Sequence, residues 1–157
     1  MKYLSQNSEL TLREGLKEYT ASHKFLNEND GHDDVSQWFR NHDVTHVIFG
    51  TRPFSLRGES LNDIWTLLGS NMKFKEYLQF FKTTGVSYKT VMKGYKKHYG
   101  SMFMVYLMMF AYIPDMLLTI YRSFKMSKEW DWHSHEEYFD MSLKDLRKEF
   151  NIQVFRS

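Results

Sequence analysis

The sequence contains no cysteine, and its charge is nearly balanced. The absence of cysteine among 157 residues excludes disulfide bonds, thiolate metal sites and cysteine nucleophiles. The 21 basic and 19 acidic side chains leave a net charge of only +2. A protein held to nucleic acid by phosphate contacts carries a larger basic excess, so no nucleic-acid partner is expected.

Proline and apolar targeting segments are also scarce. Only two prolines interrupt the chain, which leaves room for long helices. The first ten residues, MKYLSQNSEL, contain neither an apolar signal core nor an arginine-rich transit sequence, so the expected location is the cytoplasm. The sequence also lacks the G-x-G-x-x-G fingerprint of a dinucleotide-binding loop.

Helical patterns follow one another along the chain, without a repeat, a linker or sustained strand alternation. The length fits one domain, and 17% aromatic residues with ten methionines suit a large apolar core. We therefore predict an all-α single domain over residues 1–157, a multi-helix bundle with an apolar central helical hairpin. The predicted helices cover residues 11–26, 33–49, 59–68, 71–85, 87–99, 101–113, 115–125 and a short stretch within 142–155.

Two helix starts carry specific capping signals. Thr11 and Glu14 have the spacing of a capping box at the start of the first helix. Asp33 or Asp34 is expected to cap the second helix, after a turn centred on Gly31. A loop over residues 50–58 is predicted to separate the second and third helices.

Two histidines four residues apart lie in the second predicted helix, within WFRNHDVTHVIFG. A helix advances about 100° per residue, so His46 and several apolar side chains fall within about 60° of His42. The two imidazoles lie one turn apart on the apolar face and can point at one atom. Asp43 borders this face, and Glu59 stands at the predicted start of the next helix. Imidazole and carboxylate suit a divalent cation, zinc in particular.

An ordinary core is the competing interpretation of these histidines. With 7 histidines in the chain, chance alone gives about 0.3 such spacings. A histidine on an apolar face is usually a hydrogen-bonded core residue. The spacing by itself is compatible with both interpretations. Asp43 could also contact a metal-binding residue without binding the metal itself, or act as a general base.

The run HDVTHVIFG…LRGE resembles the signature of the coenzyme Q (ubiquinone) biosynthesis protein 4 family, in which H-D-x-x-H is followed by a glutamate. YRSFKMSKEWDW and YFDMSLKDLRKEFNI are similar to the family's C-terminal pattern of aromatics before a short helix. The resemblance implies an all-helical protein that binds zinc or a similar ion through His42, Asp43, His46 and Glu59. Twelve residues separate His46 from Glu59, one more than the family's usual spacing.

The resemblance also implies a function in ubiquinone synthesis. It implies action on a polyprenylated aromatic acid, by oxidative decarboxylation of the ring, and the organisation of other ubiquinone biosynthesis proteins. Asp43 and Glu59 would then transfer protons. Two alternatives are a non-catalytic prenyl-lipid-binding scaffold with a structural metal and a zinc-dependent hydrolase. The hydrolase fits less well, because Asp43 stands where zinc peptidases carry a glutamate.

The most apolar segment, SMFMVYLMMFAYIPDMLLTIY, carries a single charge at Asp115. Pro114 and Asp115 interrupt it after about thirteen residues, too few for a membrane span. A buried hairpin of two helices is therefore predicted. Its methionines, among them Met104 and Met108, can adapt to a long isoprenoid ligand or simply fill a core.

Two groups of basic residues offer contacts with anions. Arg52 and Arg57, in the loop before Glu59, could bind an anionic head group or lie in solvent. A row of lysines in the fifth predicted helix is either a solvated face or a contact with anionic lipids at the inner face of the membrane. This row comprises Lys89, Lys93, Lys96 and Lys97.

A second histidine cluster occurs in WDWHSHEEYF. His133 and His135 are two residues apart and do not share a helical face, so this cluster is not expected to bind metal. Ser134 and Glu137 have the spacing of a capping box, which predicts the start of a helix.

Overall fold

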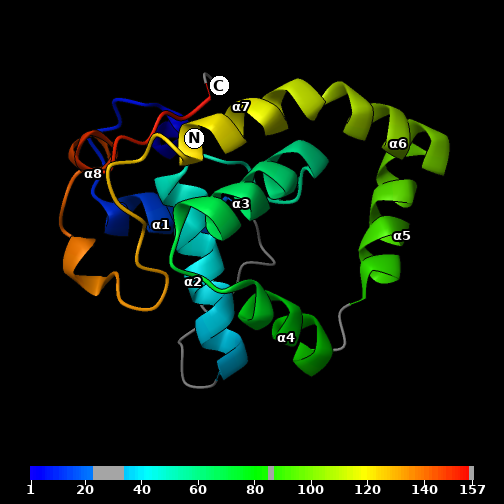
Figure 1. Cartoon of the computed structure of the whole chain (residues 1–157), viewed down its shortest axis with the longest axis horizontal. Helices are drawn as coiled ribbons and strands as arrows, with labels where there is room; N and C mark the ends of the chain where they lie inside the picture. Colours follow the sequence, from blue (N-terminus) through cyan, green and yellow to red (C-terminus); the bar gives the residue numbers. More distant parts are fainter. Residues whose placement is uncertain (23–33, 85–86, 156–157) are drawn as a thin grey trace.

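The computed structural model describes residues 1–22, 34–84 and 87–155. Within these ranges the chain forms eight α-helices, two short 3₁₀ helices and no strand, so the predicted all-α class is confirmed (Figure 1). In chain order these are η1 (Lys2–Leu4), α1 (Leu12–Ala21), α2 (Asp34–Ile48), α3 (Leu56–Gly69), α4 (Phe74–Thr84), α5 (Tyr88–Tyr99), α6 (Met102–Ala111), α7 (Ile113–Ser123), η2 (Glu136–Tyr138) and α8 (Leu143–Glu149).

The helix boundaries follow local capping chemistry. The capping box of Thr11 and Glu14 is present at the start of α1. The expected continuation of this helix to residue 26, the turn at Gly31 and the cap at Asp33 lie outside the described residues, and Asp34 is the first residue of α2. Helix α3 begins three residues before the predicted position, because the Ser55 side chain accepts a hydrogen bond from the backbone N–H of Gly58.

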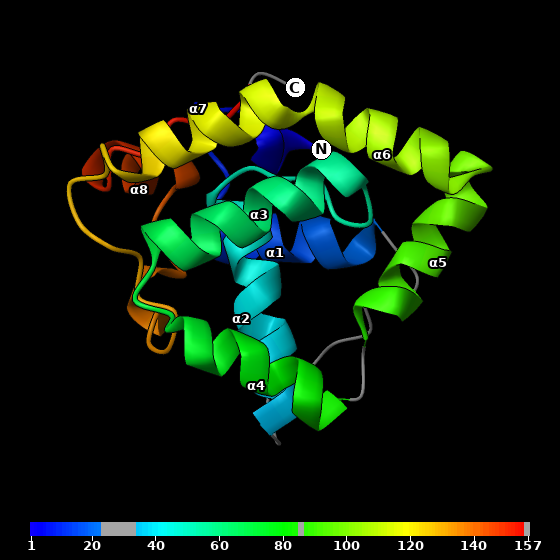
Figure 2. The ribbon, with the colours of Figure 1, turned by 45° about the vertical axis from the view of Figure 1, so that its right-hand side comes forward.

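Helix α2 runs through the centre of the molecule, with α1, α3, α4 and α8 packed around it (Figures 1 and 2). Its C-terminal half contributes Val44, Val47 and Ile48 to the main hydrophobic core, which also holds residues of η1, α1, α8 and the C-terminal segment. Burial of a side chain of this size stabilises the fold by about 2 kcal/mol. The core therefore fixes the end of α2 that carries the two histidines.

A buried arginine on α8 binds the C-terminal end of α2 through hydrogen bonds. Arg147 is fully buried and donates hydrogen bonds to the carbonyl oxygens of Val47 and Ile48, in the last turn of α2, and of Tyr3 and Ser5. These carbonyls include groups that a helix end leaves without an internal partner. Burial lowers the pKa of Arg147 to about 10, so the guanidinium is still charged at neutral pH.

Helices α6 and α7 do not form the predicted buried hairpin. They follow one another with a bend of 46° and form one arch along the edge of the molecule (Figures 1 and 2). One face of the arch packs on α3 and α5, while the opposite face is exposed. This exposed face, called the α6–α7 stripe below, comprises Phe103, Tyr106, Leu107, Phe110, Ile113, Leu117, Leu118, Tyr121 and Phe124.

The hairpin prediction failed because hydropathy reports how apolar a segment is but not what covers it. Pro114 was expected to reverse the chain, yet it lies at the start of α7, where proline is tolerated. In the described part of the chain, no single helix is long and apolar enough to cross a membrane. By length and composition, the bent pair of α6 and α7 could do so together.

The capping box predicted at Ser134 and Glu137 is wrong. The structure has only a single 3₁₀ turn there, η2, with His135 at its N-cap and no side-chain cap hydrogen bond. His135 is buried against Trp130 and Phe139. This cluster is not among the groups of described residues that could hold a metal ion.

Candidate metal centre

Helices α2 and α3 bring three of the four predicted ligands together. Glu59 Oε2 lies 3.3 Å from His46 Nε2 and 3.7 Å from His42 Nε2. The ligand atoms of these three residues all lie within 4.8 Å of one another, so the group could hold a metal ion. His46 is completely buried, whereas the side chains of His42 and Glu59 are 17% and 24% exposed. The site therefore has a buried side and an accessible side.

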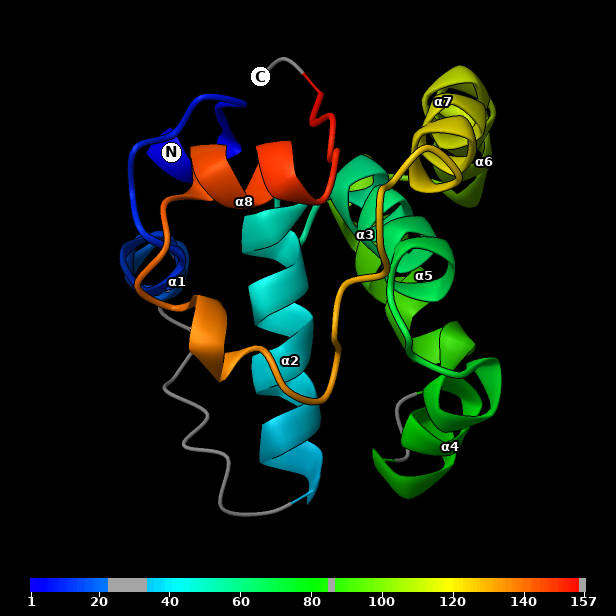
Figure 3. The same ribbon diagram turned by 60° about the vertical axis from the view of Figure 1, so that its left-hand side comes forward.

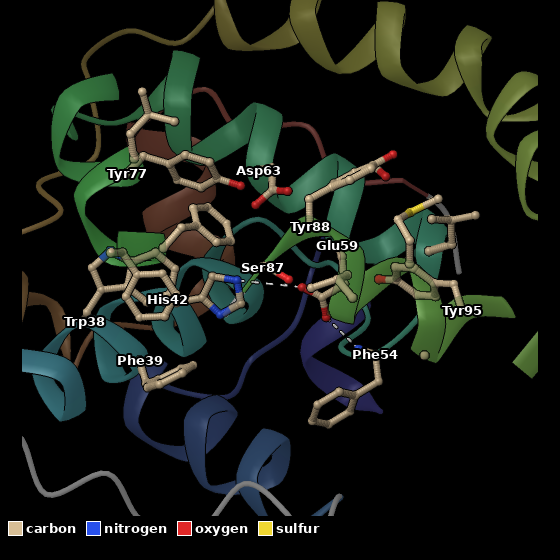
Figure 4. A pocket seen from close by; sticks show the side chains of 18 of the residues that line it. Trp38, Phe39, His42, Phe54, Glu59, Asp63, Tyr77, Ser87, Tyr88 and Tyr95 are labelled. Atoms are coloured by element: carbon tan, nitrogen blue, oxygen red, sulfur yellow. Dashed lines mark hydrogen bonds and ion pairs between the residues drawn. The ribbon is translucent and has the colours of Figure 1, made fainter. Parts of the chain in front are cut away.

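The loop before α3 places Glu59 despite its extra residue. The backbone N–H of Phe54 donates a 2.6 Å hydrogen bond to Glu59 Oε1, which leaves Oε2 facing the histidines (Figure 4). Phe54 adopts a left-handed backbone conformation, with φ of 56°. At Gly58 an added Cβ would lie 1.9 Å from the backbone oxygen of Arg52. The close approach of loop and helix at this point thus requires glycine.

A chain of buried hydrogen bonds determines which nitrogen of His46 carries the proton. His46 Nδ1 lies 2.9 Å from Thr51 Oγ1, and Thr51 Oγ1 lies 3.1 Å from Asn62 Oδ1. The amide oxygen of Asn62 can only accept, so the single hydroxyl proton of Thr51 points to it. Thr51 must therefore accept from His46, which means that Nδ1 carries a proton.

The orientation of the Asn62 amide is set by its other partner. Asn62 Nδ2 lies 3.0 Å from Thr45 Oγ1. The hydroxyl of Thr45 donates to the backbone oxygen of His42 at 2.6 Å, so Thr45 accepts from the Asn62 amide group. The NH₂ group of Asn62 thus faces Thr45 and its oxygen faces Thr51. The contacts with Thr45 and with Thr51 therefore require the same orientation of the Asn62 amide.

The remaining nitrogen of His46 has no hydrogen-bond partner. Among the described residues, Nε2 is one of the few buried side-chain nitrogens without one. With Nδ1 protonated, the lone pair of Nε2 faces a carboxylate oxygen, and two electron-rich atoms at 3.3 Å repel each other. A cation between them, either a second ring proton or a metal ion, removes this repulsion. Two imidazole nitrogens and one carboxylate oxygen form a donor set that fits zinc.

The charges in the site influence one another. Burial raises the pKa of Glu59, but its contacts with the two imidazoles and the hydrogen bond from the Phe54 N–H outweigh burial and bring this pKa down to about 2. Burial lowers the pKa of His42, but Asp43 and Glu59 outweigh it, so this pKa lies above the usual value. Glu59 is therefore an anion at neutral pH, and its charge favours a cation beside it.

Asp43 lies behind His42 and outside the group of three. Its Oδ1 is 3.8 Å from His42 Nδ1, on the side of the ring opposite to the nitrogen that faces Glu59. The same oxygen accepts a 3.0 Å hydrogen bond from the hydroxyl of Tyr19, whose ring stacks on His46. A carboxylate at the far nitrogen of a ligand histidine is a common way to orient the ring.

A cavity of about 1060 Å³ opens beside the three residues (Figure 4). His42, Asp43 and Glu59 form part of its wall. Tyr19 of α1, Phe54 of the loop before α3, and further residues of α3 also line it. Most of the remaining wall comes from α2, α4, α5 and α6 and is aromatic or aliphatic: Trp38, Phe39, Tyr77, Leu78, Phe80, Phe81, Tyr88, Val91, Met92, Tyr95 and Met109. The candidate metal centre is thus the polar end of a largely apolar space.

Stacked aromatic rings connect the histidines to the cavity wall. The Trp38 ring stacks on Phe80 with a centroid distance of 3.6 Å, and its distance to the His42 ring is 5.2 Å. Trp132 meets Trp38 edge-on at 5.6 Å. These contacts hold the Trp38 ring in one position between the two parts of the site.

Asp63 is a site residue that sequence reasoning missed. It lies one helical turn after Glu59, lines the cavity and forms a hydrogen bond with Tyr77 (Figure 4). Burial raises the pKa of Asp63, against the opposing charge of His42. The four-residue spacing from Glu59 puts both carboxylates on one face of α3, and this signal was present in the sequence.

The four residues predicted to contact a substrate lie away from the cavity. Arg57 Nε donates to Asp115 Oδ2 at 2.6 Å and Arg52 is exposed in the loop. Met104 is 38% exposed, and Met108 packs against residues of α5 and α6. Met109 and Met92 line the cavity instead. The sequence did not distinguish these methionines, because composition does not specify how α6 is rotated against α5.

Comparisons with protein-family models, with curated proteins and with solved structures give no match. The resemblance to the coenzyme Q biosynthesis protein 4 family therefore stays an expectation from the sequence. The distances, burial and hydrogen bonds of the site itself carry its chemical interpretation.

Proposed function

We propose that the protein binds a divalent metal ion, zinc in the first place, through His42, His46 and Glu59. In this proposal the metal centre and the adjoining cavity together bind an apolar molecule with an anionic aromatic head, such as a prenylated aromatic acid. The unpartnered Nε2 of His46, facing the Glu59 carboxylate at the end of an aromatic cavity, carries this proposal.

The two halves of the site fit the two halves of such a molecule. When bound, a divalent cation would supply a Lewis acid that stabilises negative charge on a carboxylate or phenolate. Trp38 and Phe80 offer flat apolar faces for an aromatic ring, and Met92 and Met109 offer flexible surface for an isoprenoid tail. A volume of about 1060 Å³ accommodates a ligand of this size.

Three carboxylates have distinct tasks in this proposal. Glu59 is the anionic ligand, and Asp43 orients His42 through Nδ1. Asp63 is the group best suited to hold a proton on its carboxyl oxygen, because burial raises its pKa and outweighs the opposing hydrogen bond from the Tyr77 hydroxyl. Proton transfer thus belongs with Asp63 more than with the Asp43 and Glu59 pair that the sequence indicated.

The family resemblance adds a candidate reaction. Replacing the ring carboxyl group of a prenylated aromatic acid by a hydroxyl releases carbon dioxide and requires an oxidant such as dioxygen. The substrate of this reaction has the anionic head and the apolar tail that the site accommodates. The same cavity would serve a non-catalytic carrier that presents the prenylated molecule to other ubiquinone biosynthesis proteins.

Metal analysis tests the first half of the proposal. Purified protein should contain or take up stoichiometric zinc, and His46→Ala should lose it. His133→Ala, which removes an exposed histidine outside the site, is the matched control and should retain the metal. Stoichiometric metal in a folded His46→Ala protein would exclude the site.

Ligand binding tests the second half. Calorimetry should detect binding of a prenylated hydroxybenzoate, with weaker binding after metal removal and little binding of the acid without its tail. Equal affinity with and without metal would contradict a role of the metal in holding the head.

Cells that lack the decarboxylation step separate the two roles. Restoration of quinone synthesis that depends on His46 supports catalysis, whereas restoration by the folded, metal-free His46→Ala protein supports the scaffold. Release of product from generic ester or peptide substrates would instead indicate a hydrolase.

A further inference from the structure

The side chains of the α6–α7 stripe lie on one side of both helices. At about 100° per residue, all of its members fall within about 80° of Phe103, even across the bend. Phe103 and Phe110 are 73% and 72% exposed. Among residues 103–124, all described by the structure, the exposed side chains include no charged residue. A continuous apolar face of this kind marks an interaction surface.

Both ends of the stripe carry positive charge. Lys96 and Lys97 are exposed in the last turn of α5, just before α6 begins. Lys125 is exposed directly after Phe124, at the other end. The one acidic residue of the segment, Asp115, lies on a different face and is paired with Arg57. The surface is therefore apolar along its length and basic at both ends.

We propose that the α6–α7 stripe docks on a lipid bilayer that contains anionic lipids, with the two helices lying in the plane of the membrane surface. Large apolar side chains enter the boundary between headgroups and acyl chains, and the lysines at both ends contact the headgroups. This inference does not depend on the metal centre. Figure 3 shows α6 and α7 almost end-on at the edge of the molecule, outside α3 and α5, where a flat surface can reach them.

The inner face of the two helices is what keeps them on the surface instead of across the membrane. Thr119 and Ser123 of α7 are buried, and α7 packs against α3. The ion pair between Arg57 and Asp115 also joins α3 to α7. Crossing the bilayer would strip these contacts and leave polar groups in hydrocarbon.

A second copy of the chain is the less favourable occupant. Two stripes packed against each other, whether parallel or antiparallel, would bring the basic end of one chain against a basic end of the other. Like charges at both ends of an apolar interface oppose association. Anionic headgroups instead complement these charges, so electrostatics favours the lipid surface.

Docking would also place the cavity beside the membrane. Met109 lies on the inner face of α6 and forms part of the cavity wall, while the stripe covers the outer face of the same helix. An apolar molecule dissolved in the bilayer would then have a short route to the protein interior. This consequence rests on the proposed function, whereas the docking itself does not.

Vesicle binding of the full chain tests the proposal. The protein should sediment with phosphatidylcholine vesicles that contain about 30 mol% phosphatidylglycerol, and added salt should weaken this binding. Replacing Phe103, Phe110 and Leu117 by serine should lower the partition coefficient more than tenfold. The matched control, Phe74→Ser with Leu68→Ser, removes exposed apolar side chains elsewhere and should leave binding unchanged.

Charge variants and an extraction step complete the test. Lys96→Gln, Lys97→Gln and Lys125→Gln together should weaken binding to anionic vesicles about tenfold or more, whereas Lys17→Gln with Lys148→Gln should not. Circular dichroism and zinc content verify folding of each variant. Equal binding by the serine variant, resistance of the bound protein to carbonate extraction, or a dimer without vesicle binding that the serine variant dissociates would each overturn the proposal.

Discussion

Thr51 accepts a hydrogen bond from Nδ1 of His46, while Nε2 of the same ring points at the Glu59 carboxylate. The first contact keeps the proton on one nitrogen, and the second presents the free nitrogen to a cation. Because Thr51 does not itself touch the metal position, its effect on metal binding is a sensitive probe of this geometry.

Thr51→Val should weaken zinc binding by about ten- to a hundredfold, because it removes the acceptor for His46 Nδ1 at almost constant volume. Thr51→Ser keeps the hydroxyl and should retain most of the affinity. Competition with a chromogenic chelator measures both. Unchanged affinity in the valine variant would show that Thr51 does not position His46.

Gly58→Ala should destabilise the protein by about 3 kcal/mol, because the new Cβ collides with the Arg52 backbone oxygen. The zinc affinity of the folded fraction should fall as well, since Glu59 follows directly. Gly94→Ala is the matched control: nothing lies within 4 Å of its added Cβ in α5. That change should stabilise the protein by about 0.5–1 kcal/mol. Urea denaturation compares the two.

Phe80→Ala should reduce the affinity for a prenylated aromatic ligand at least tenfold while zinc content stays the same. The substitution removes the ring that stacks on Trp38 and lines the cavity, without touching the three metal-binding residues. It should also cost about 3 kcal/mol of stability, so binding is measured well below the melting temperature. Phe74→Ala, on the exposed start of α4, should alter neither property. Loss of zinc in Phe80→Ala would argue against separate roles of the cavity wall in ligand binding and of the three metal-binding residues.

Zinc affinity should fall as the pH decreases from 8 to 6. The pKa of His42 lies above the usual imidazole value, so protons compete with the metal at a higher pH than for an isolated histidine. Glu59, with a pKa of about 2, stays ionised over this pH range and does not contribute to the pH dependence of the zinc affinity. A drop of at least tenfold is expected by calorimetry. A flat profile would mean that His42 is not a ligand.

Sequence periodicity was sufficient to place His42 and His46 on one face, because both lie in the same helix. Glu59 was a candidate from its position at the start of the next predicted helix, and the family resemblance marked it as a ligand, since no periodicity connects two helices across a loop. Thr51 and Asn62 could not be predicted, because their hydrogen bonds depend on how α3 packs against the end of α2. Asp63 could have been found from its spacing to Glu59 alone.

The all-α class followed from local patterns, but the environment of α6 and α7 did not. The sequence of α6 is apolar on every side, so composition could not separate its covered face from its exposed one. In α7 the polar Thr119 and Ser123 are buried and the apolar face is exposed, the reverse of what hydropathy alone suggests. For the same reason the sequence does not show that Met109, and not Met104 or Met108, lines the cavity. Helix rotation is set by tertiary packing, which a single sequence does not specify.

The stacking of Trp38 on both Phe80 and His42 makes this residue an optical reporter of two separate events. A protonated imidazole quenches the emission of an indole beside it, and displacement of that proton by a metal relieves the quenching. A ligand that enters next to Phe80 changes the polarity around the same indole and shifts the wavelength of its emission. Metal binding should therefore change the intensity of the Trp38 emission, and ligand binding should shift its wavelength. Both can be followed in one titration without an added dye.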